Sequence, residues 1–466
     1  MVFQKSKATL LLAVVLLVGC PAEKQTKPDE TDKGPAIGKR ELNYSVSTAS
    51  GSKSALHVEV EFLGAGSGET TFILPTRVEP GSGEKTGVTN LQVEGKEVDV
   101  SEGKEPDQRT IKHAPASLVR VSYDVSQVAE PNYKTNRYGP FVEEGRVFFT
   151  GSTVFGHPKR MHPGLERTIR IDWSGLTEKW RVETSLGAPT ERHSELETAL
   201  GAVEKSIFVA GNIDVLERKV GDSKVRVAVI GDLAIETDEI TGLIVETIEA
   251  ERKFWGDSDF APFLVALYAA EDCCWAAGAS SYESFAAIVA RKDPKKTESS
   301  LAQLVAHEYM HTWIPGEFGS PRPFNAYAWV TEGFTQYFAR RIKIEIDHYG
   351  FETYVEKVNG MIEKYWNSPV RDASRTRVNR EFGRNPKLQQ LPYFQGELLA
   401  LNWNAQIVKA TGGEHSIADV VRRLAEQHGS DDSRRLSDSN LAAAIHEFAA
   451  DVEVEPVIER HIEEGK

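Results

Sequence analysis

The stretch SSLAQLVAHEYMHTW, residues 299–313, carries the pattern on which the interpretation of this chain depends. Its apolar residues recur at helical spacing behind a serine that can cap a helix, so the stretch predicts an α-helix. Residues four apart lie on one face of a helix, and His307 and His311 can therefore bind one metal ion together. Glu308 points about 100° away around the helix axis, which places its carboxylate beside a water on the metal rather than on the metal itself.

A second helical pattern, WVTEGFTQYFARR at 329–341, contains the acidic residue that completes this set. Prolines and glycines between the two segments can turn the chain back, so that Glu332 reaches the histidines. Two histidines and one carboxylate leave the fourth position of a tetrahedral zinc site open for water, as catalytic sites require. The sequence therefore predicts one zinc ion per chain, held by His307, His311 and Glu332. A solvated surface helix that carries His and Glu is the structural alternative.

Together, HEYMHTW and WVTEGFTQYFARR resemble the gluzincin zinc metallopeptidases, and among them the glycyl aminopeptidase family. The resemblance is strong over residues 260–412. It implies a thermolysin-like catalytic domain and a zinc-dependent peptidase, an aminopeptidase by family, with Glu308 as the general base. The segment PYFQGELLALNW at 392–403 resembles the helix that carries the catalytic tyrosine of this clan, which falls on Tyr393. A phenol at that place can donate a hydrogen bond to the oxygen of a tetrahedral intermediate.

The pattern of apolar residues divides the chain into two kinds of structure. Short runs that alternate apolar and polar residues make residues 42–215 typical of an antiparallel, β-sandwich-like domain. Residues 216–466 are expected to form the thermolysin-like catalytic domain, with a small mixed α/β lobe and then a helical lobe. The predicted fold class is α+β and multidomain. Strands are expected at 224–231, 263–270 and 285–292, and helices at 236–256, 299–313, 328–346, 351–367, 392–410, 416–428 and 437–450.

The first residues are typical of a bacterial lipoprotein signal. A short basic start precedes an apolar run that is about half as long as a membrane-spanning helix. The run ends in Leu-Val-Gly-Cys, which resembles a lipobox, so we expect a signal peptide over 1–19 and a lipid on Cys20. An ordinary secretory signal is the alternative. Residues 20–41 have the composition of a flexible tether, and Pro21, by resemblance, favours the outer membrane of a bacterial envelope.

The region before the expected zinc helix departs from the family pattern. An aminopeptidase needs an acid that captures the α-ammonium group of its substrate, and the family places a glutamate on the strand before the zinc helix. That glutamate falls near Ser280 here, in a Gly-Ala-Ser-Ser stretch that begins at Gly278. The stretch is still expected to form an edge that pairs with an extended peptide, and Glu283, Glu271 and Asp272 are candidates for the missing acid. Cleavage within peptides and removal of N-terminal residues both remain open.

The net charge of the chain argues against one class of function. The 69 acidic residues outnumber the 55 basic ones, and the resulting net charge of -14 argues against nucleic-acid binding. The expected partners are a peptide or protein substrate and, through the lipid, the membrane. No PDZ domain is expected after the helical lobe, although members of the family often carry one. A catalytically silent, peptide-binding envelope lipoprotein with the same fold is the alternative function.

Overall fold

The structure, a computed structural model, describes most of the chain from Glu41 to Lys466. The described residues are 41–75, 87–126, 140–161, 163–270, 276–281, 283–290, 294–319, 321–430 and 435–466, and of 276–281, 290, 294–297 and 429–430 only the backbone is described. The predicted signal peptide, Cys20 and residues 21–40 of the tether lie outside these ranges. Within them, no helix combines the length and the apolar composition that crossing a lipid bilayer requires.

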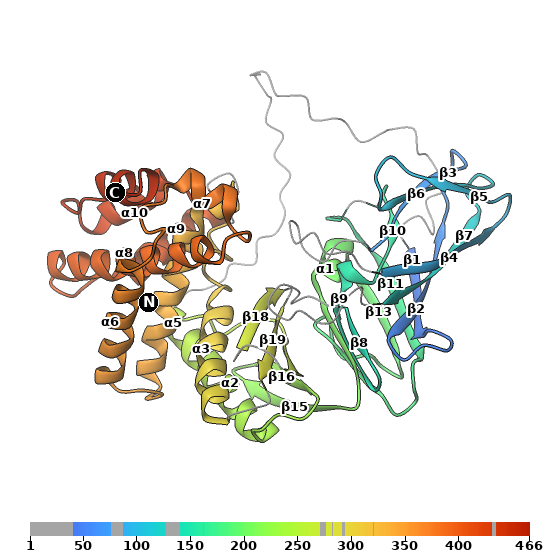
Figure 1. The fold of residues 1–466 in the computed structure, drawn as a ribbon, viewed down its shortest axis with the longest axis horizontal. Helices are drawn as coiled ribbons and strands as arrows, with labels where there is room; N and C mark the ends of the chain where they lie inside the picture. The colour runs from blue at the N-terminus through green and yellow to red at the C-terminus, as the bar shows by residue number, and fades with distance from the viewer. Residues whose placement is uncertain are drawn as a thin grey trace, which may run out of the picture.

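The N-terminal half, at the right of Figure 1, is a set of β-sheets. Their orders are β13-β11-β1-β2-β7-β4, β10-β3-β6-β5 and β12-β14-β9-β8. Burial alternates along the strands; in β2, Val58 and Val60 are fully buried, whereas Glu59 between them is half-buried. The elements are β1 (Glu41–Thr48), β2 (Ala55–Leu63), β3 (Glu69–Ile73), β4 (Gly87–Gly95), β5 (Asp99–Glu102), β6 (Gln108–Lys112), β7 (Leu118–Ser126), β8 (Phe141–Glu143), β9 (Arg146–Thr150), β10 (His157–Pro158), β11 (Glu166–Gly175), β12 (Arg181–Thr184), β13 (His193–Ala199), α1 (Leu200–Lys205) and β14 (Ile207–Gly211).

One strand pair in this half differs from the antiparallel arrangement that the sequence predicts. β1 and β11 are parallel, with Leu42 opposite Ile169. These strands are far apart in the chain, so the connection between them can cross over the sheet, whereas short connections require antiparallel neighbours. Local alternation of apolar residues reports that a strand forms, but not the direction of its partner.

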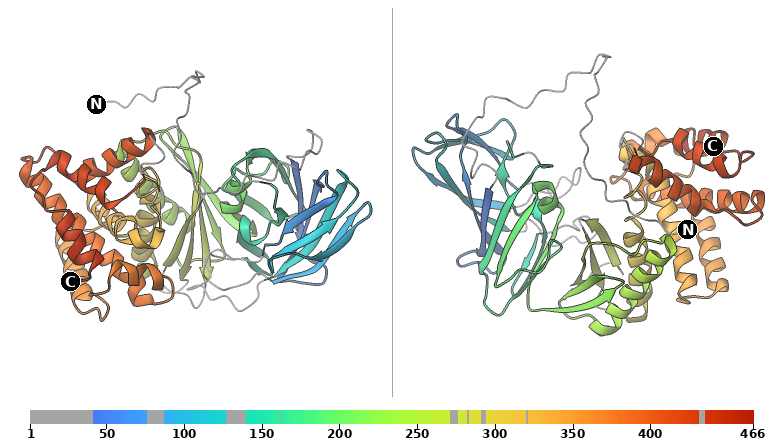
Figure 2. Two further views of the ribbon diagram at one scale, coloured as in Figure 1. Left: turned by 90° about the horizontal axis from the view of Figure 1, so that it is seen from above. Right: turned by 180° about the vertical axis from the view of Figure 1, so that it is seen from behind.

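A five-stranded mixed sheet lies between the β half and the helices (Figures 1 and 2). Its order is β15-β16-β17-β19-β18, in which β16, β17 and β19 are parallel and the two edge strands are antiparallel to their neighbours. Val227 and Val265 pack with the helices, whereas Ala228 and Ala266 pack with β8, β9 and β14. Burial on both faces explains why β17 is apolar along its whole length and why β16 is apolar from Val227 to Ile230. The elements are β15 (Ile213–Val220), β16 (Ser223–Ile230), α2 (Thr237–Trp255), β17 (Phe263–Ala270), β18 (Ala276–Ser281) and β19 (Ser284–Ala290).

A buried ion pair joins the β half to this sheet. Arg226 of β16 binds the carboxylate of Glu183 on β12 through Nη1 and donates to the carbonyl of Thr184 through Nη2 at 2.8 Å. The two charged side chains are 7% and 2% exposed. Both charges lose their hydration here, so each depends on the other for compensation. The pair therefore ties the position of β12 to that of β16.

The C-terminal lobe is helical, as the sequence predicts, and lies at the left of Figure 1. Its apolar side chains join one core with the helix-facing side of the mixed sheet. The helices are α3 (Pro294–Met310), α4 (Ala328–Thr331), α5 (Gly333–Glu345), α6 (Phe351–Trp366), α7 (Arg375–Glu381), α8 (Pro386–Ala410), α9 (Ile417–Ser430), α10 (Asp438–Phe448) and α11 (Glu455–Ile458).

Three predicted helix boundaries in this lobe are wrong. The helix expected at 299–313 is α3, which begins at Pro294 and ends at Met310, so the serine expected to cap it lies inside the helix; proline is favoured at the first helical position. The helix expected at 392–410 begins earlier, at Pro386, because Asn385 caps it by accepting hydrogen bonds from the backbone N–H groups of Lys387 and Leu388. Pro392 consequently lies inside the helix rather than at its start. The segment expected at 328–346 is divided into α4 and α5, with Glu332 at the junction.

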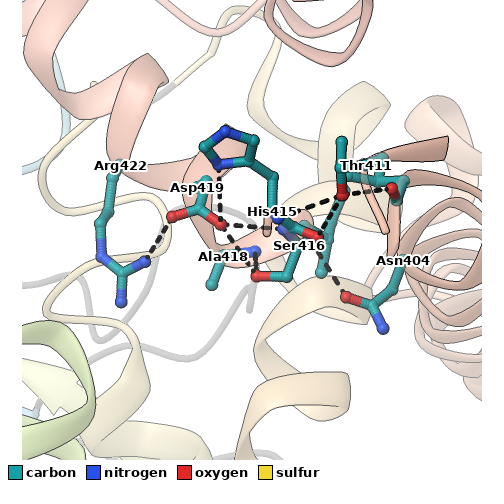
Figure 3. Close-up of polar contacts among 9 residues, drawn as sticks. Asn404, Thr411, His415, Ser416, Ala418, Asp419 and Arg422 are labelled. Atoms are coloured by element: carbon teal, nitrogen blue, oxygen red, sulfur yellow. Dashed lines mark hydrogen bonds and ion pairs between the residues drawn. The ribbon is translucent and has the colours of Figure 1, made fainter. Parts of the chain in front are cut away.

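The start of α9 is held by the polar network in Figure 3. Ser416 accepts a hydrogen bond from the backbone of Ala418 through Oγ, and Asp419 accepts from both the backbone and the hydroxyl of Ser416, a reciprocal capping arrangement. Asn404 of α8 accepts from the backbone of Ile417. These contacts satisfy N–H groups that the helix itself leaves unpaired, and they attach α9 to α8.

We expect Ser416→Ala to destabilise the protein by about 1 kcal/mol, because the substitution removes a helix-capping oxygen. Urea unfolding followed by circular dichroism measures this change. Ser416→Asp keeps an acceptor at the cap and is the control, with an expected loss well below that of the alanine variant. Equal stability of all three proteins would show that the network in Figure 3 contributes nothing.

Candidate metal centre

The two histidines of the HEYMH sequence come from the end of α3. His307 lies in the last turn of the helix, and His311 follows its final residue, Met310, in a turn that continues the same backbone direction. The two imidazole rings are 4.8 Å apart between centroids and nearly perpendicular. One ring therefore presents its edge to the other, which leaves a ring nitrogen of each free to face a common point.

Glu332, at the junction of α4 and α5, brings its carboxylate to that point. Its Oε2 lies 3.2 Å from Nε2 of His307 and 3.6 Å from Nε2 of His311. Two ligands bound tetrahedrally at zinc distances are separated by about 3.4 Å. The three residues, named here the His–His–Glu cluster (His307, His311 and Glu332), offer ligand atoms that all lie within 4.8 Å of one another. The donor set and its spacing thus fit a zinc ion.

Backbone contacts select the ring nitrogen that His311 presents to the cluster. Nδ1 of His311 lies 2.8 Å from the carbonyl oxygen of Ile314. A carbonyl can only accept, so Nδ1 carries the proton and the lone pair of the neutral ring is on Nε2, the atom that faces Glu332. Thr335 of α5 also donates to this carbonyl, at 3.3 Å. Nδ1 of His307 is buried, and a hydrogen bond with Gln336 is among the contacts that raise the pKa of this histidine.

The charges of the cluster change the pKa values of its members. Burial raises the pKa of Glu332, but the facing imidazoles of His311 and His307 and a hydrogen bond from Tyr393 outweigh burial and lower this pKa from 4.5 to about 2. Burial lowers the pKa of His307, whereas Glu332 and Glu308 raise it, and the net change is upward. The metal-free cluster therefore favours a proton shared between imidazole and carboxylate, which a metal ion has to displace.

The two predicted catalytic residues lie next to the cluster. Glu308 is half-buried and close enough to His307 to contribute to the pKa of that histidine. Tyr393, on α8, stacks on His307 with the ring centroids 5.7 Å apart and the planes at 22°, and it hydrogen-bonds Glu332. The structure thus brings residues from three separated segments, α3, the start of α5 and α8, to one place.

A glycine contact that the sequence analysis did not single out permits this arrangement. Gly333 of α5 and Gly396 of α8 face each other, and a Cβ built on Gly396 would lie 1.5 Å from the carbonyl oxygen of Trp329. Any side chain at Gly396 would therefore separate α8 from the α4–α5 junction. The Gly after Glu332 and the Gly three residues after Tyr393 are the sequence signals that could have indicated the contact.

The residues predicted to bind substrate lie in and beside an edge strand of the mixed sheet. Gly278 and Ser280 lie in β18, the edge strand of the mixed sheet, opposite Ala287 and Phe285 of β19. This confirms that the stretch forms an edge, but the side chains at 276–281, and Glu271 and Asp272, lie outside the described part of the chain. Glu283 is in the turn between β18 and β19, where burial raises its pKa and Arg252 of α2 opposes that rise. Its described interaction is thus with α2, and a role in binding substrate stays a prediction.

Comparisons with known proteins agree with the resemblance found in the sequence. The family model of the M61 glycyl aminopeptidases matches residues 300–381, which include the His–His–Glu cluster and Glu308 but not Tyr393. No curated protein matches the chain in sequence. The family match supports a peptidase, and the resemblance to the gluzincin zinc metallopeptidases is confirmed over these residues.

Solved structures show the same fold. An aminopeptidase N family protein from Idiomarina loihiensis superimposes with a TM-score of 0.75 at 14% identity, over 91% of this chain and 76% of that one. An M1 zinc metallopeptidase variant from Deinococcus radiodurans, bound to a Tyr-Ser-Ala substrate, superimposes with a TM-score of 0.57 at 14% identity, over 92% of this chain and 94% of that one. At these identities the likeness shows the fold alone, and it confirms the predicted α+β multidomain class.

We expect Glu332→Gln to weaken zinc binding by more than about 100-fold, because the change removes a charged ligand and not merely an outer partner of a ligand. Competition against a chromophoric chelator measures the affinity. Glu363→Gln, which removes an exposed acid of α6, is the matched control and should bind zinc as the native chain does. Native affinity in the Glu332 variant would exclude this carboxylate as a ligand.

The metal-free protein should lose stability in acid through Glu332. The folded-state pKa of about 2 lies below the ordinary 4.5, so the charged carboxylate stabilises the fold above pH 4.5, and this contribution disappears as the pH falls through about 2. Unfolding in the presence of a chelator should therefore show a smaller loss of stability from pH 5 to pH 2 in Glu332→Gln than in the native chain. Parallel curves for the two proteins would contradict the lowered pKa.

Proposed function

We propose that this chain is a zinc-dependent peptidase that hydrolyses peptide bonds, with His307, His311 and Glu332 as metal ligands and Glu308 as general base. The observation that carries the proposal is the set of three ligand atoms within 4.8 Å of one another. Glu308, the residue after His307 on α3, adds a carboxylate beside them. A structural zinc site would use a fourth protein ligand, whereas this set leaves one position open. The family match over residues 300–381 supports the same conclusion.

The proposed chemistry divides between the ion and the side chains. A zinc ion bound by the His–His–Glu cluster would act as a Lewis acid that polarises the peptide carbonyl. It would also lower the pKa of water so that the water could be activated near neutral pH. Glu308 accepts the proton of the attacking water and returns it to the leaving amine nitrogen. Tyr393 donates a hydrogen bond to the carbonyl oxygen as negative charge develops there. Ile314 holds His311 in the tautomer that presents Nε2.

The finer part of the proposal is aminopeptidase activity. Supporting it are the family match and the structural neighbours, of which one from Deinococcus radiodurans is bound to Tyr-Ser-Ala. The edge strand β18 packs against α3 and has its outer side free of a neighbouring strand in the sheet order, which is an arrangement that can pair with an extended peptide. Ser280 stands near the place of the family glutamate that captures the α-ammonium group of the substrate. The peptide-library experiment below therefore determines whether cleavage is terminal or internal.

We further propose that the protein is held at the bacterial envelope, in the outer membrane, by a lipid on Cys20. The support is the sequence alone: a basic start, an apolar run too short to span a bilayer, and Cys20 at the expected cleavage position. Residues 20–41 would then separate the folded domains from the membrane.

Glu308→Gln is the substitution that tests the catalytic proposal. We expect it to retain zinc, because Glu308 is not a ligand, and to lower turnover by at least about 10³-fold, because the general base is lost. The measurement is mass spectrometry of products from a mixed peptide library, which also reports whether cleavage is terminal or internal. Adding a chelator should abolish all products of the native protein.

Two results of this experiment would contradict the proposal. A native protein that binds zinc but cleaves no peptide would favour the silent binding lipoprotein. A Glu308→Gln variant with native turnover would remove Glu308 from the chemistry. Glu363→Gln is again the matched control, because it removes a carboxylate from an exposed position on α6.

A further inference from the structure

Two polar contacts join helices α5 and α8. At the first, Tyr393 of α8 hydrogen-bonds Glu332, the residue that precedes α5. At the second, Arg340 of α5 binds Glu397 of α8. Tyr393 and Glu397 are four residues apart, so they project from one face of α8. Glu332 immediately precedes α5, and Arg340 lies about two turns further along that helix.

The second contact is a buried, bidentate ion pair. Nε of Arg340 lies 2.5 Å from Oε1 of Glu397, and Nη2 lies 3.1 Å from Oε2. The side chains are 10% and 4% exposed. Two parallel bonds between a planar guanidinium and a planar carboxylate fix orientation as well as distance.

The glycine contact between the helices sets their separation, and apolar packing limits the rotation of α8. Gly333 and Gly396 let the backbones touch, and Leu399, Ala400 and Trp403 of α8 are buried in the core. Apolar contacts are non-directional, whereas a bidentate bond pair fixes orientation. A rotation of α8 that moves Tyr393 away from His307 also moves Glu397, because both lie on one face. Such a rotation has to break the bond pair to Arg340.

Stability alone does not account for an ion pair at this place. Replacing a buried pair by apolar side chains of similar size is often neutral or stabilising, because the desolvation of both charges is avoided. Other polar groups lie beside the pair: Tyr349 donates to the carbonyl of Arg340 at 3.1 Å, and burial together with Lys357 and Arg340 lowers the pKa of Lys343 to about 7. The distinctive property of the pair is orientation.

We propose that Arg340 and Glu397 are positioning residues that set the rotation of α8 and so hold Tyr393 against the His–His–Glu cluster. This inference rests on the proposed function, in which Tyr393 stabilises the developing oxyanion. Arg340 and Glu397 touch neither the cluster nor the reacting atoms, and they act through Tyr393.

The test is a double-mutant cycle that uses a double variant, Arg340→Met with Glu397→Leu. Both charges are removed together, so no charge is left buried without a partner, and the melting temperature should stay near that of the native protein. We expect kcat to fall about 10-fold with KM within about twofold, because a small misplacement affects the transition state more than binding. In a Tyr393→Phe background, the same double variant should lower kcat by no further factor.

A matched control removes another deeply buried ion pair. Arg226→Met with Glu183→Leu eliminates a pair of similar burial between β16 and β12, away from α8, and it should leave kcat within about twofold of the native value. Two results would overturn the inference. One is a native kcat in the Arg340 and Glu397 double variant. The other is a loss of kcat in that variant that multiplies with the loss caused by Tyr393→Phe.

A second readout separates this inference from the proposed function. Crystal structures of the zinc-loaded native protein and of the Arg340 and Glu397 double variant report the ring of Tyr393 directly. We expect the ring to leave its stack on His307 in the variant. An unmoved Tyr393 would overturn the positioning role even if the enzyme were active, whereas a displaced Tyr393 in a protein that cleaves no peptide would uphold the positioning role and reject the proposed function.

Discussion

The need to hold one carboxylate within ligand distance of two imidazoles is the constraint on which the catalytic half of the structure depends. His307 and His311 are local neighbours at the end of α3, but Glu332 belongs to another element and reaches them only if α3 and α5 are packed together. The apolar core that covers one face of the mixed sheet supplies that packing. The sheet itself is buried on its other face by strands of the β half. The large core and the contact of the mixed sheet with the β half therefore both help to hold the Glu332 carboxylate within a few ångströms of the two imidazoles.

Helix α5 is the element that connects ligand geometry to the tyrosine. Its start carries the Glu332 carboxylate, its next residue makes the close glycine contact with α8, and its later turns carry Arg340. Thr335 on the same helix donates to Ile314, the carbonyl that sets the tautomer of His311. One helix thus contacts both other contributors to the site. A shift of α5 would disturb the cluster, the tautomer and Tyr393 together.

Predictions from sequence succeeded where the relevant interaction is local and failed where it depends on distant partners. The strands of the β half and the amphipathic helices follow from alternation and helical spacing, because each residue's exposure is set by its own element. The helix expected at 392–410 begins earlier, because Asn385 caps it and Pro386 takes the first helical position. The parallel pairing of β1 with β11 was missed, since alternation carries no information on direction. Arg340 and Glu397 have no signal in a single sequence.

The sequence by itself determined the donor set and its chemistry: two histidines four apart, a glutamate beside the first, and a glutamate on a following helix. Helical periodicity is a property of the backbone, so this part needed no knowledge of the rest of the chain. Only the tertiary structure decided that Glu332 faces Nε2 of both rings, that Tyr393 stacks on His307, and that an ion pair orients α8. These relations join residues on separate elements, and packing of their apolar faces, which a local pattern does not encode, sets the distances between them.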